Sequence, residues 1–535
     1  MTSAKKLAVG VVLLGVLGMF AYSLLGWFDQ RTEYQAKIER GRTLAGTQCA
    51  LCHLEPSPEI LPKRSWESVL GYMGFKLGMS NIDHLSGHPA FGQANVRSRR
   101  AILARDDALP EVPVLTTDNW DALRHYFTES APDSPLEQVG KPELTWALPQ
   151  FRITQTNYRV PQAVTTLVHI REDTQQVYIG DSARRTLTTL GHNGQIVAAP
   201  KPLGEVLPVD IVFSDDRAYV GSIGDLTAAR PVEDKLGSIW SLELTGQRIA
   251  DAEPEALIEN IYRMADMAIV DLNSDGQLDF IACGFGTVVG RVSWFESQPD
   301  GSYEERLLLD LPGSVKVDTH DLNGDGLEDI VVLLSDAKEG LHVLVNKGDN
   351  EFEDRLIFQT HPGYGHTYFE LVDFDGDERM DLLVVNGDNV DSDPYNTRKN
   401  FHGVRIYLNQ GDLRFEEAFF YPMYGAFIAK AADFDGDGDM DIAAIAFYPD
   451  YSSDRRESFT YLENQGGFRF RPYTDPELMR GRWMTMDIGD LDGDQDVDVV
   501  LGGGYHPVGM LGYRELYREL AETGPAVLVL KNTRY

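Results

Sequence analysis

The most informative residues of this chain are two cysteines and a histidine between positions 49 and 53. Cys49 and Cys52 lie three positions apart and His53 follows directly, in the pattern C-x-x-C-H. Thiols at this spacing can each form a thioether to one edge of a porphyrin, and the adjacent imidazole then reaches the iron. The chain has only 3 cysteines in 535 residues, so chance does not account for the arrangement. The pattern predicts one covalently attached haem c.

A second axial ligand of the iron is expected downstream of this motif. Met73 and Met79 are both candidates, because a thioether sulfur is a common partner of histidine at electron-carrying haems. Met73 lies seven residues after Trp66, which places both side chains on one helical face and makes Met73 the preferred ligand. His84 or His88 would instead give a bis-histidine haem. The predicted cofactor-binding residues are therefore Cys49, Cys52, His53 and Met73.

Two helices are predicted to flank the haem motif. Residues 34–48 lead into it, and residues 117–130 carry Trp120, Leu123 and Phe127 on one helical face. A helix that ends in C-x-x-C-H, followed by an aromatic-rich closing helix, resembles a small cytochrome c domain over about residues 34–132. The resemblance implies an electron-carrying all-α domain, which we assign to residues 28–132.

The N-terminal segment is predicted to anchor the chain in a membrane. Residues 7–27 are uncharged and long enough to span a bilayer. Lys5 and Lys6 precede this run and Asp29 follows it, so residues 1–6 are expected in the cytoplasm. A cleaved signal peptide is the alternative, although the apolar run exceeds the usual length of its core. We predict a single-pass anchor in the inner membrane, with the bulk of the chain in the periplasm.

Five acidic loops recur along the second part of the chain, roughly 50 to 60 residues apart. They cover residues 271–279, 321–329, 373–381, 433–441 and 490–498. Oxygen ligands at loop positions 1, 3 and 5, a main-chain carbonyl at 7 and a carboxylate at 9 suit Ca²⁺. An EF-hand is excluded, because position 12 is not glutamate and each loop precedes a strand rather than a helix.

About five calcium ions are therefore expected. Their predicted ligands occupy alternate positions of the loops: Asp271, Asn273, Asp275, Gln277 and Asp279; Asp321, Asn323, Asp325, Leu327 and Asp329; Asp373, Asp375, Asp377, Arg379 and Asp381; Asp433, Asp435, Asp437, Asp439 and Asp441; Asp490, Asp492, Asp494, Asp496 and Asp498.

The repeat also predicts the architecture. Four strands are expected in each unit, and the third often ends in asparagine, as in residues 341–346, 404–409 and 459–464. Four antiparallel strands per repeat are typical of a propeller blade. The loops and the asparagine-ended strands resemble the FG-GAP/VCBS repeat family, related to the propellers of integrin α-subunits, over about residues 150–535. That resemblance implies a propeller whose loop carboxylates bind calcium.

Seven blades are expected. Two degenerate units, over residues 165–181 and 209–222, precede the five with acidic loops. The final strand, residues 527–532, lacks a fourth strand after it, and residues 151–158 are expected to supply one.

The predicted fold class is therefore multidomain: an N-terminal transmembrane helix, a small all-α cytochrome c domain, and an all-β seven-bladed propeller over residues 150–535. Residues 133–149 contain several prolines and are predicted to be a linker. If that linker is flexible, the haem and the calcium ions should act independently.

Composition and motifs narrow the function. The formal net charge of −35 disfavours nucleic acid as a partner. No catalytic residue, nucleophile–base pair or phosphate loop is evident, which favours an electron carrier over a stand-alone catalyst. We predict a membrane-anchored periplasmic electron-transfer protein whose propeller docks a redox protein or assembles a membrane complex. The alternatives are an oxidoreductase whose propeller oxidises a substrate and passes electrons to the haem, and a binding or adhesion propeller with a haem sensor.

Overall fold

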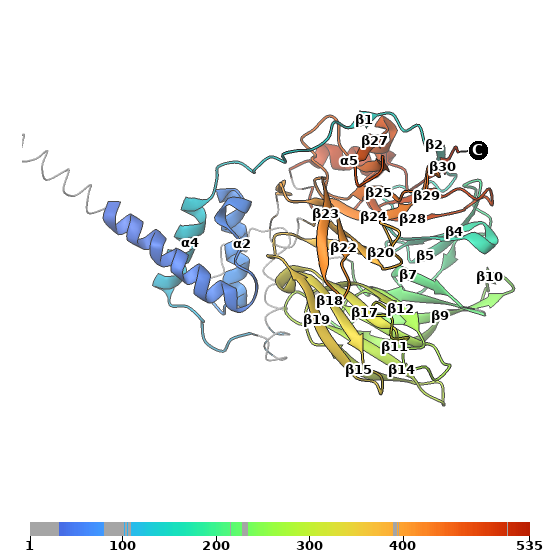
Figure 1. Ribbon diagram of the computed structural model, residues 1–535, viewed down its shortest axis with the longest axis horizontal. Helices are drawn as coiled ribbons and strands as arrows, with labels where there is room; N and C mark the ends of the chain where they lie inside the picture. The colour runs from blue at the N-terminus through green and yellow to red at the C-terminus, as the bar shows by residue number, and fades with distance from the viewer. Residues whose placement is uncertain are drawn as a thin grey trace, which may run out of the picture.

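The computed structural model of this chain describes residues 31–79, 101, 104, 109–214, 216–226, 234–388, 393, 395–510 and 512–534. Its largest part is a ring of seven β-sheets, and a group of helices lies against one face of the ring (Figure 1). The prediction of a seven-bladed β-propeller is therefore confirmed.

The blades follow one another in chain order, with four antiparallel strands in each sheet and short additions to blades two and six. Blades one and two contain β3 (Thr165–Arg171), β4 (Gln176–Asp181), β5 (Thr186–Gly191), β6 (Lys201–Pro202), β7 (Pro208–Phe213), β8 (Arg217–Ser222), β9 (Gly237–Thr245), β10 (Arg248–Ile249) and β11 (Glu255–Ile261). Blades three and four contain β12 (Met264–Val270), β13 (Asp279–Gly284), β14 (Arg291–Ser297), β15 (Tyr303–Leu309), β16 (Ser314–His320), β17 (Asp329–Leu334), β18 (Gly340–Asn346) and β19 (Phe352–Gln359).

The remaining blades repeat this plan. Blades five and six contain β20 (His366–Val372), β21 (Asp381–Asn386), β22 (Gly403–Asn409), β23 (Phe415–Pro422), β24 (Ala426–Ala432), β25 (Asp441–Ala446), β26 (Phe459–Asn464) and β27 (Phe470–Thr474). Blade seven contains β28 (Trp483–Gly489), β29 (Asp498–Gly503), β30 (Val527–Asn532) and β2 (Phe151–Gln155). Short helices in the loops are η4 (Glu172–Thr174), η5 (Asp336–Lys338), η6 (Pro476–Arg480) and α5 (Arg514–Thr523).

The second strand of each acidic-loop blade is buried along its whole length. In β17 the sequence Asp-Ile-Val-Val-Leu-Leu is buried at every position. A strand that packs between two neighbouring sheets has no solvent face, so it is a continuous run of apolar residues rather than an alternating one. The core of the propeller lies between the blades for this reason.

The ring closes where the two ends of the propeller sequence meet. β2 pairs antiparallel with β30, with Phe151 opposite Asn532. The predicted pairing of residues 151–158 with the final strand is therefore confirmed. A side chain also joins the last blade to the first. Asp487 Oδ2 in blade seven accepts a hydrogen bond from the backbone N–H of Ile170 in blade one at 2.8 Å.

The two ends of the ring differ in character. In an antiparallel meander, successive hairpin loops emerge on opposite ends of the blade. The loops between first and second strands hold the five acidic segments, and we call this end the acidic-loop face. The loops between second and third strands form the opposite end, which we call the cap face because the helices lie there (Figure 1).

The helices on this face form a unit that we call the cap. Its members are a helix that includes residues 31–48, η1 (Cys49–Leu51), η2 (Pro58–Ile60), α2 (Lys63–Lys76) and α4 (Thr117–Ser130). α4 begins where the sequence predicts, because the Thr116 side chain accepts a hydrogen bond from the Asn119 N–H at 3.3 Å. Its expected apolar face, with Trp120, Leu123 and Phe127, is buried inside the cap.

The predicted fold class is wrong about these helices, which do not form a separate all-α cytochrome c domain. Buried polar groups of α2 bond directly to loops of the cap face. Ser65 Oγ lies 2.8 Å from Thr397 Oγ1, and Tyr72 OH donates to Thr287 Oγ1 at 3.0 Å. Because α2 buries one face among the helices and another against the propeller, the cap relies on the propeller to complete its packing.

The membrane segment has a different status. Residues 7–27, predicted to span a bilayer, lie outside the described residues. Within the described residues, no helix is both long enough and apolar enough to cross a membrane.

The segment between cap and propeller lies along blade six. The backbone N–H of Gln138 donates to Tyr424 OH at 3.1 Å, and Lys141 forms an ion pair with Glu457. β1 (Thr145–Trp146) then adds a parallel strand to the outer edge of β27. These contacts tie the connection to the ring over much of its length.

A channel opens among the innermost strands of the blades. It encloses about 2460 Å³ of non-atom space, part of it open to solvent, and ionisable side chains line its wall. Lys316 Nζ lies 3.0 Å from Asp266 Oδ2. Burial, and then the negative charge of Asp266, raise the pKa of the nearby Asp210 carboxyl to about 7.

Candidate functional site

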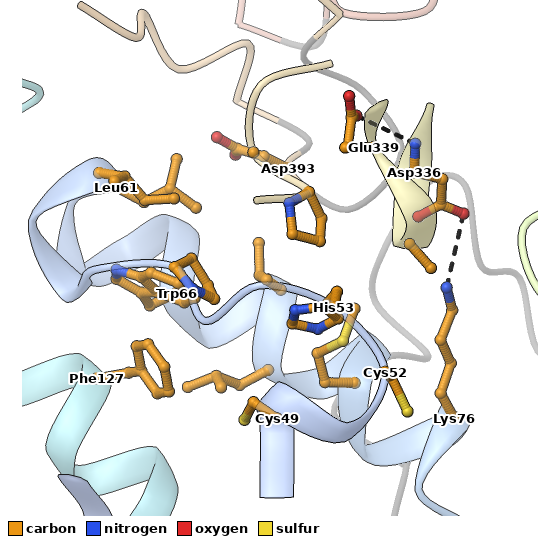
Figure 2. A pocket seen from close by; sticks show the side chains of 18 of the residues that line it. Cys49, Cys52, His53, Leu61, Trp66, Lys76, Phe127, Asp336, Glu339 and Asp393 are labelled. Atoms are coloured by element: carbon orange, nitrogen blue, oxygen red, sulfur yellow. Dashed lines mark hydrogen bonds and ion pairs between the residues drawn. The ribbon is translucent and has the colours of Figure 1, made fainter. Parts of the chain in front are cut away.

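A cavity lies between the cap and the cap face of the propeller (Figure 2). It contains about 1390 Å³ of non-atom space, part of which is open to solvent. All four predicted haem ligands lie on its wall: Cys49, Cys52, His53 and Met73. The first two belong to the turn around η1 and Met73 belongs to α2, so the fold brings together residues that the sequence predicted to share one cofactor.

The backbone around the motif turns tightly enough to present its side chains to one space. The N–H groups of Cys52 and His53 both donate to the Cys49 carbonyl, at 3.2 and 3.4 Å. His53 Nδ1 lies 2.8 Å from the carbonyl oxygen of Leu54. A carbonyl can only accept, so Nδ1 carries the proton and Nε2 keeps the lone pair that can bind a metal.

Burial governs the electrostatics of the motif. It raises the pKa of the Cys49 thiol to about 11, with the charge of Glu55 as a smaller contribution. It also lowers the pKa of His53. Both shifts favour the neutral form, so His53 offers an uncharged imidazole near neutral pH.

The cap side of the cavity is apolar and includes the preferred axial methionine. Trp66, Leu70 and Phe127 line it together with Met73. Met79 is buried in the cap core instead, and it is not among the described residues that line the cavity. His84 and His88 lie outside the described residues. The structure thus brings Met73, rather than Met79, to the wall that His53 shares.

The propeller side of the cavity is polar, and sequence reasoning did not find it. Asp336, Glu339 and Lys399 line it from two loops of the cap face. Glu339 is 0% exposed, and its oxygens accept hydrogen bonds from the N–H groups of Gly365 and His366 at 3.0 and 3.1 Å. Burial raises the pKa of Glu339 well above its usual value. Nothing in the sequence distinguishes Glu339 from the other acids of the chain.

These observations fit a covalently held porphyrin. Two thiols and a neutral imidazole with a free Nε2 are the donor set that such a group requires. The apolar cap wall suits the body of the ring. On the propeller wall, Lys399 is the cation that would meet the carboxylates of the ring, beside the acids Asp336 and Glu339.

Each acidic loop is closed around its first aspartate. In blade four, Asp321 Oδ1 accepts from the Gly324 N–H and Asp321 Oδ2 accepts from the Gly326 N–H, both at 2.8 Å. Both glycines have positive φ angles, which side-chain-bearing residues rarely adopt. The loop residue five positions after the first aspartate donates in the same way in blades three, five, six and seven.

Position 7 of the loop supports position 5. The N–H groups of Gln277, Leu327 and Arg379 donate to the carboxylates two residues earlier at 2.8, 2.9 and 3.0 Å. The guanidinium of Arg379 also forms an ion pair with Asp377. Position 7 therefore acts through its backbone, which explains how its residue type can vary between blades.

The ninth-position aspartate joins the loop to the third strand of the blade. Asp381 Oδ1 accepts from the Asn409 N–H at 2.7 Å, and Asp381 Oδ2 accepts from the Phe374 N–H at 2.9 Å. Asn409 Nδ2 donates in turn to the Met380 carbonyl at 3.1 Å. Burial raises the pKa of Asp381 to about 6. These bonds give the asparagine at the end of the third strand a physical role.

Carboxylates gather in the loops of blades five to seven. Three from each loop lie with ligand oxygens within 4.8 Å of one another: Asp373, Asp375 and Asp381; Asp433, Asp435 and Asp441; Asp490, Asp492 and Asp494. In blades three and four, Asn273 and Asn323 supply an amide at position 3 instead. Asp433 Oδ1 and Asp498 Oδ2 are buried without a hydrogen-bond partner within the described part of the chain. Unpartnered buried carboxylate oxygens fit a bound hard cation, and oxygen-only donors suit Ca²⁺.

Comparison with protein families finds a match over part of the propeller. A model of the FG-GAP-like repeat matches residues 271–332 and 321–384, which include the acidic loops of blades three, four and five. The chain carries FG-GAP repeats. No curated protein matches the chain.

Two solved structures that are similar to this chain are only distantly similar. Luciferin-regenerating enzyme is 12% identical, with a TM-score of 0.36, over 59% of this chain and 96% of its own. A structure of S. cerevisiae Dbp5 bound to Nup159, Gle1, IP6 and ADP is 10% identical, with a TM-score of 0.40, over 74% of this chain and 98% of its own. At these values neither likeness carries an argument about function.

Proposed function

We propose that this protein transfers electrons through one covalent c-type haem held between its cap and its FG-GAP propeller. The carrying observation is that Cys49, Cys52, His53 and Met73 meet on one cavity wall. A bound haem would supply an iron that changes reversibly between its ferrous and ferric states. The chain's own contribution is to fix the ring by two thioethers, to present His53 Nε2, and to bury the ring between an apolar and a polar wall.

A redox partner is proposed to dock beside the motif. Leu51, inside C-x-x-C-H, is 72% exposed, and Leu54 directly after it is 46% exposed. Exposed apolar side chains at this edge of the cavity suit transient contact with another protein. An FG-GAP propeller is itself consistent with a binding or scaffolding role. The periplasmic location stays a prediction from the sequence.

Extraction of the haem tests this proposal. Purified protein should retain haem through acid–acetone treatment and show a c-type reduced spectrum. Cys49→Ala or Cys52→Ala should abolish or cripple this retention. Cys283→Ala is the matched control, because Cys283 is fully buried in β13 within the propeller. Free extraction of haem from the wild-type protein would overturn the proposal.

We also propose that the acidic loops bind Ca²⁺ and that the ions hold the blades rather than take part in electron transfer. Loops such as residues 373–381 bring several carboxylates together, and these repel one another unless a cation is bound. Metal analysis of protein purified in calcium-containing buffer tests this. Protein that holds less than one calcium ion per chain would contradict it.

A further inference from the structure

The five acidic loops have different neighbours at one position of the third strand of each blade. Strand pairing places one residue of the third strand directly opposite the ninth-position aspartate, as the register of β29 and β30 shows, where Val499 faces Leu530. The same register in the other blades identifies the equivalent residues, which we call the cross-strand residues: Glu296, Val345, Leu408, Glu463 and Lys531, in blades three to seven.

In blades three and seven the cross-strand residue contacts position 3 of its loop. In blade three, Asn273 Nδ2 donates to Glu296 Oε1 at 3.1 Å. In blade seven, Lys531 Nζ forms an ion pair with Asp492, the position-3 carboxylate. The register places this residue beside the ninth-position aspartate, and its side chain contacts position 3 as well.

The charge of this residue changes sign between blades six and seven. In blade six the cross-strand residue is the anion Glu463, which the register of β25 and β26 places opposite the ninth-position Asp441. In blade seven the cross-strand residue is the cation Lys531, whose side chain is 13% exposed. One blade therefore adds an anion beside its predicted ion, and the other already holds a cation there.

We propose that the cross-strand residue grades the calcium affinity of the five loops, and that the blade-seven loop binds calcium most weakly. This inference rests on the proposed binding of calcium. A calcium ion entering the blade-seven loop must displace the Lys531 ammonium from Asp492 before that carboxylate can become a ligand. In blade six the ion gains the attraction of Glu463 instead. The blade-seven loop remains a site, because Asp498 Oδ2 and Asp492 Oδ1 are buried without hydrogen-bond partners among the described residues.

The count of bound ions at controlled free calcium tests the grading. The whole protein is equilibrated in calcium-buffered solutions, and calcium per chain is measured after gel filtration. The wild type should pass through a plateau of four ions per chain before the fifth binds. Lys531→Leu, which copies the blade-five residue Leu408, should bring the fifth ion to roughly tenfold lower free calcium, about 1.4 kcal/mol. Glu463→Lys should lower the plateau from four ions to three.

Controls separate the possible failures. Lys347→Leu removes a charge from an exposed lysine just after Asn346 and should leave the count unchanged. If Lys531→Leu fails to fold, Lys531→Gln keeps a polar side chain without the charge and should give the same gain. Identical binding curves for wild type, Lys531→Leu and Lys531→Gln would overturn the grading while leaving calcium binding intact. An absence of bound calcium in every variant would instead overturn the proposed calcium sites.

Discussion

The two faces of this propeller build their proposed sites in different ways, one by repetition of a loop and the other by assembly of distant segments. The acidic-loop face repeats one loop five times, and each copy is held by bonds within its own blade, such as Asp381 to Asn409. The cavity at the cap face is instead assembled from α2, α4, the motif and three propeller loops. A defect in one acidic loop leaves four others, whereas the cavity is lined by residues of the described chain that do not belong to the repeated loops. Repetition thus protects the first face, and the second depends on each of its contacts.

Removal of calcium should have the largest effect on the repeated face. Occupancy of a site stabilises the fold by roughly 2.7 kcal/mol when free calcium exceeds the dissociation constant a hundredfold. Loss of calcium from several sites on treatment with EGTA should therefore lower the melting temperature strongly, as measured by calorimetry. An unchanged melt would show that the loops hold without metal.

The same chelation experiment tests whether the two faces are independent. A flexible linker predicts a haem potential that does not respond to EGTA. The cavity, however, takes part of its wall from loops of the propeller, including Glu339 and Lys399. We therefore expect loosening of the blades to shift the haem midpoint potential, as measured by redox titration. A potential that stays constant while the propeller melts earlier would show that the cap holds the haem alone.

Substitution of Met73, the proposed axial ligand, should affect only the cap face. Met73→Ala should remove the weak near-infrared sulfur-to-iron band of the oxidised protein and lower the midpoint potential. Met79→Ala is the matched control, because Met79 is buried in the cap core and should leave the band in place. If Met79→Ala alone removes the band, the assignment of Met73 is wrong. If neither does, His84 or His88 becomes the candidate.

The docking contacts of α2 should have a smaller effect. Ser65→Ala leaves the Thr397 hydroxyl buried without this partner, which costs about 1–3 kcal/mol. Urea denaturation should show the loss, with a matching increase in proteolysis of the cap. Thr128→Ala is the control, because Thr128 Oγ1 donates to the Arg124 carbonyl within its own helix. Equal stability of the two variants would mean that the Ser65 contact adds nothing to docking.

The channel should affect stability only through pH. Asp210 has a folded-state pKa of about 7, above its usual 3.8, and Asp266 and Lys316 are the charges that face it. Between these pH values the folded state holds a proton that the unfolded state has lost. Stability should therefore fall as pH rises from about 4 to 7, and Asp210→Asn should flatten that slope. Urea unfolding at pH 5 and pH 8 measures it. If the Asp210→Asn variant keeps the wild-type dependence of unfolding free energy on pH, another group holds the proton.

Features that depend on the local sequence could be predicted better than features that depend on contacts between distant segments. The blades, the ring closure at β2 and the helix at Thr117–Ser130 follow from strand periodicity, repeats and capping, which are visible within short windows. The meeting of Met73 with His53 could also be predicted, because both lie in one small helical unit.

The polar wall of the cavity could not be predicted in this way. Glu339 lies almost three hundred positions after the motif, and only the docking of the cap places it there. The same limit explains why the sequence predicts a separate all-α domain: it does not show that the helices pack against the propeller. The small polar residues Ser65 and Thr397 carry no periodic signal, yet their contact joins cap to propeller.

The ring closure has a consequence for the order in which the molecule is built. Gln150 Nε2 bonds to Asn532 Oδ1 across a separation of 382 positions, and β2 pairs with β30 beside it. During synthesis β2 emerges first among the strands of blade seven and must wait, without its partner strand, until β30 has been made. The residues of the cap, including Cys49 to His53, are made before this point, although the cap completes its packing only against the propeller. If haem is attached as proposed, the motif is available for attachment while the ring is still open, and the pairing of β30 with β2 closes the ring afterwards.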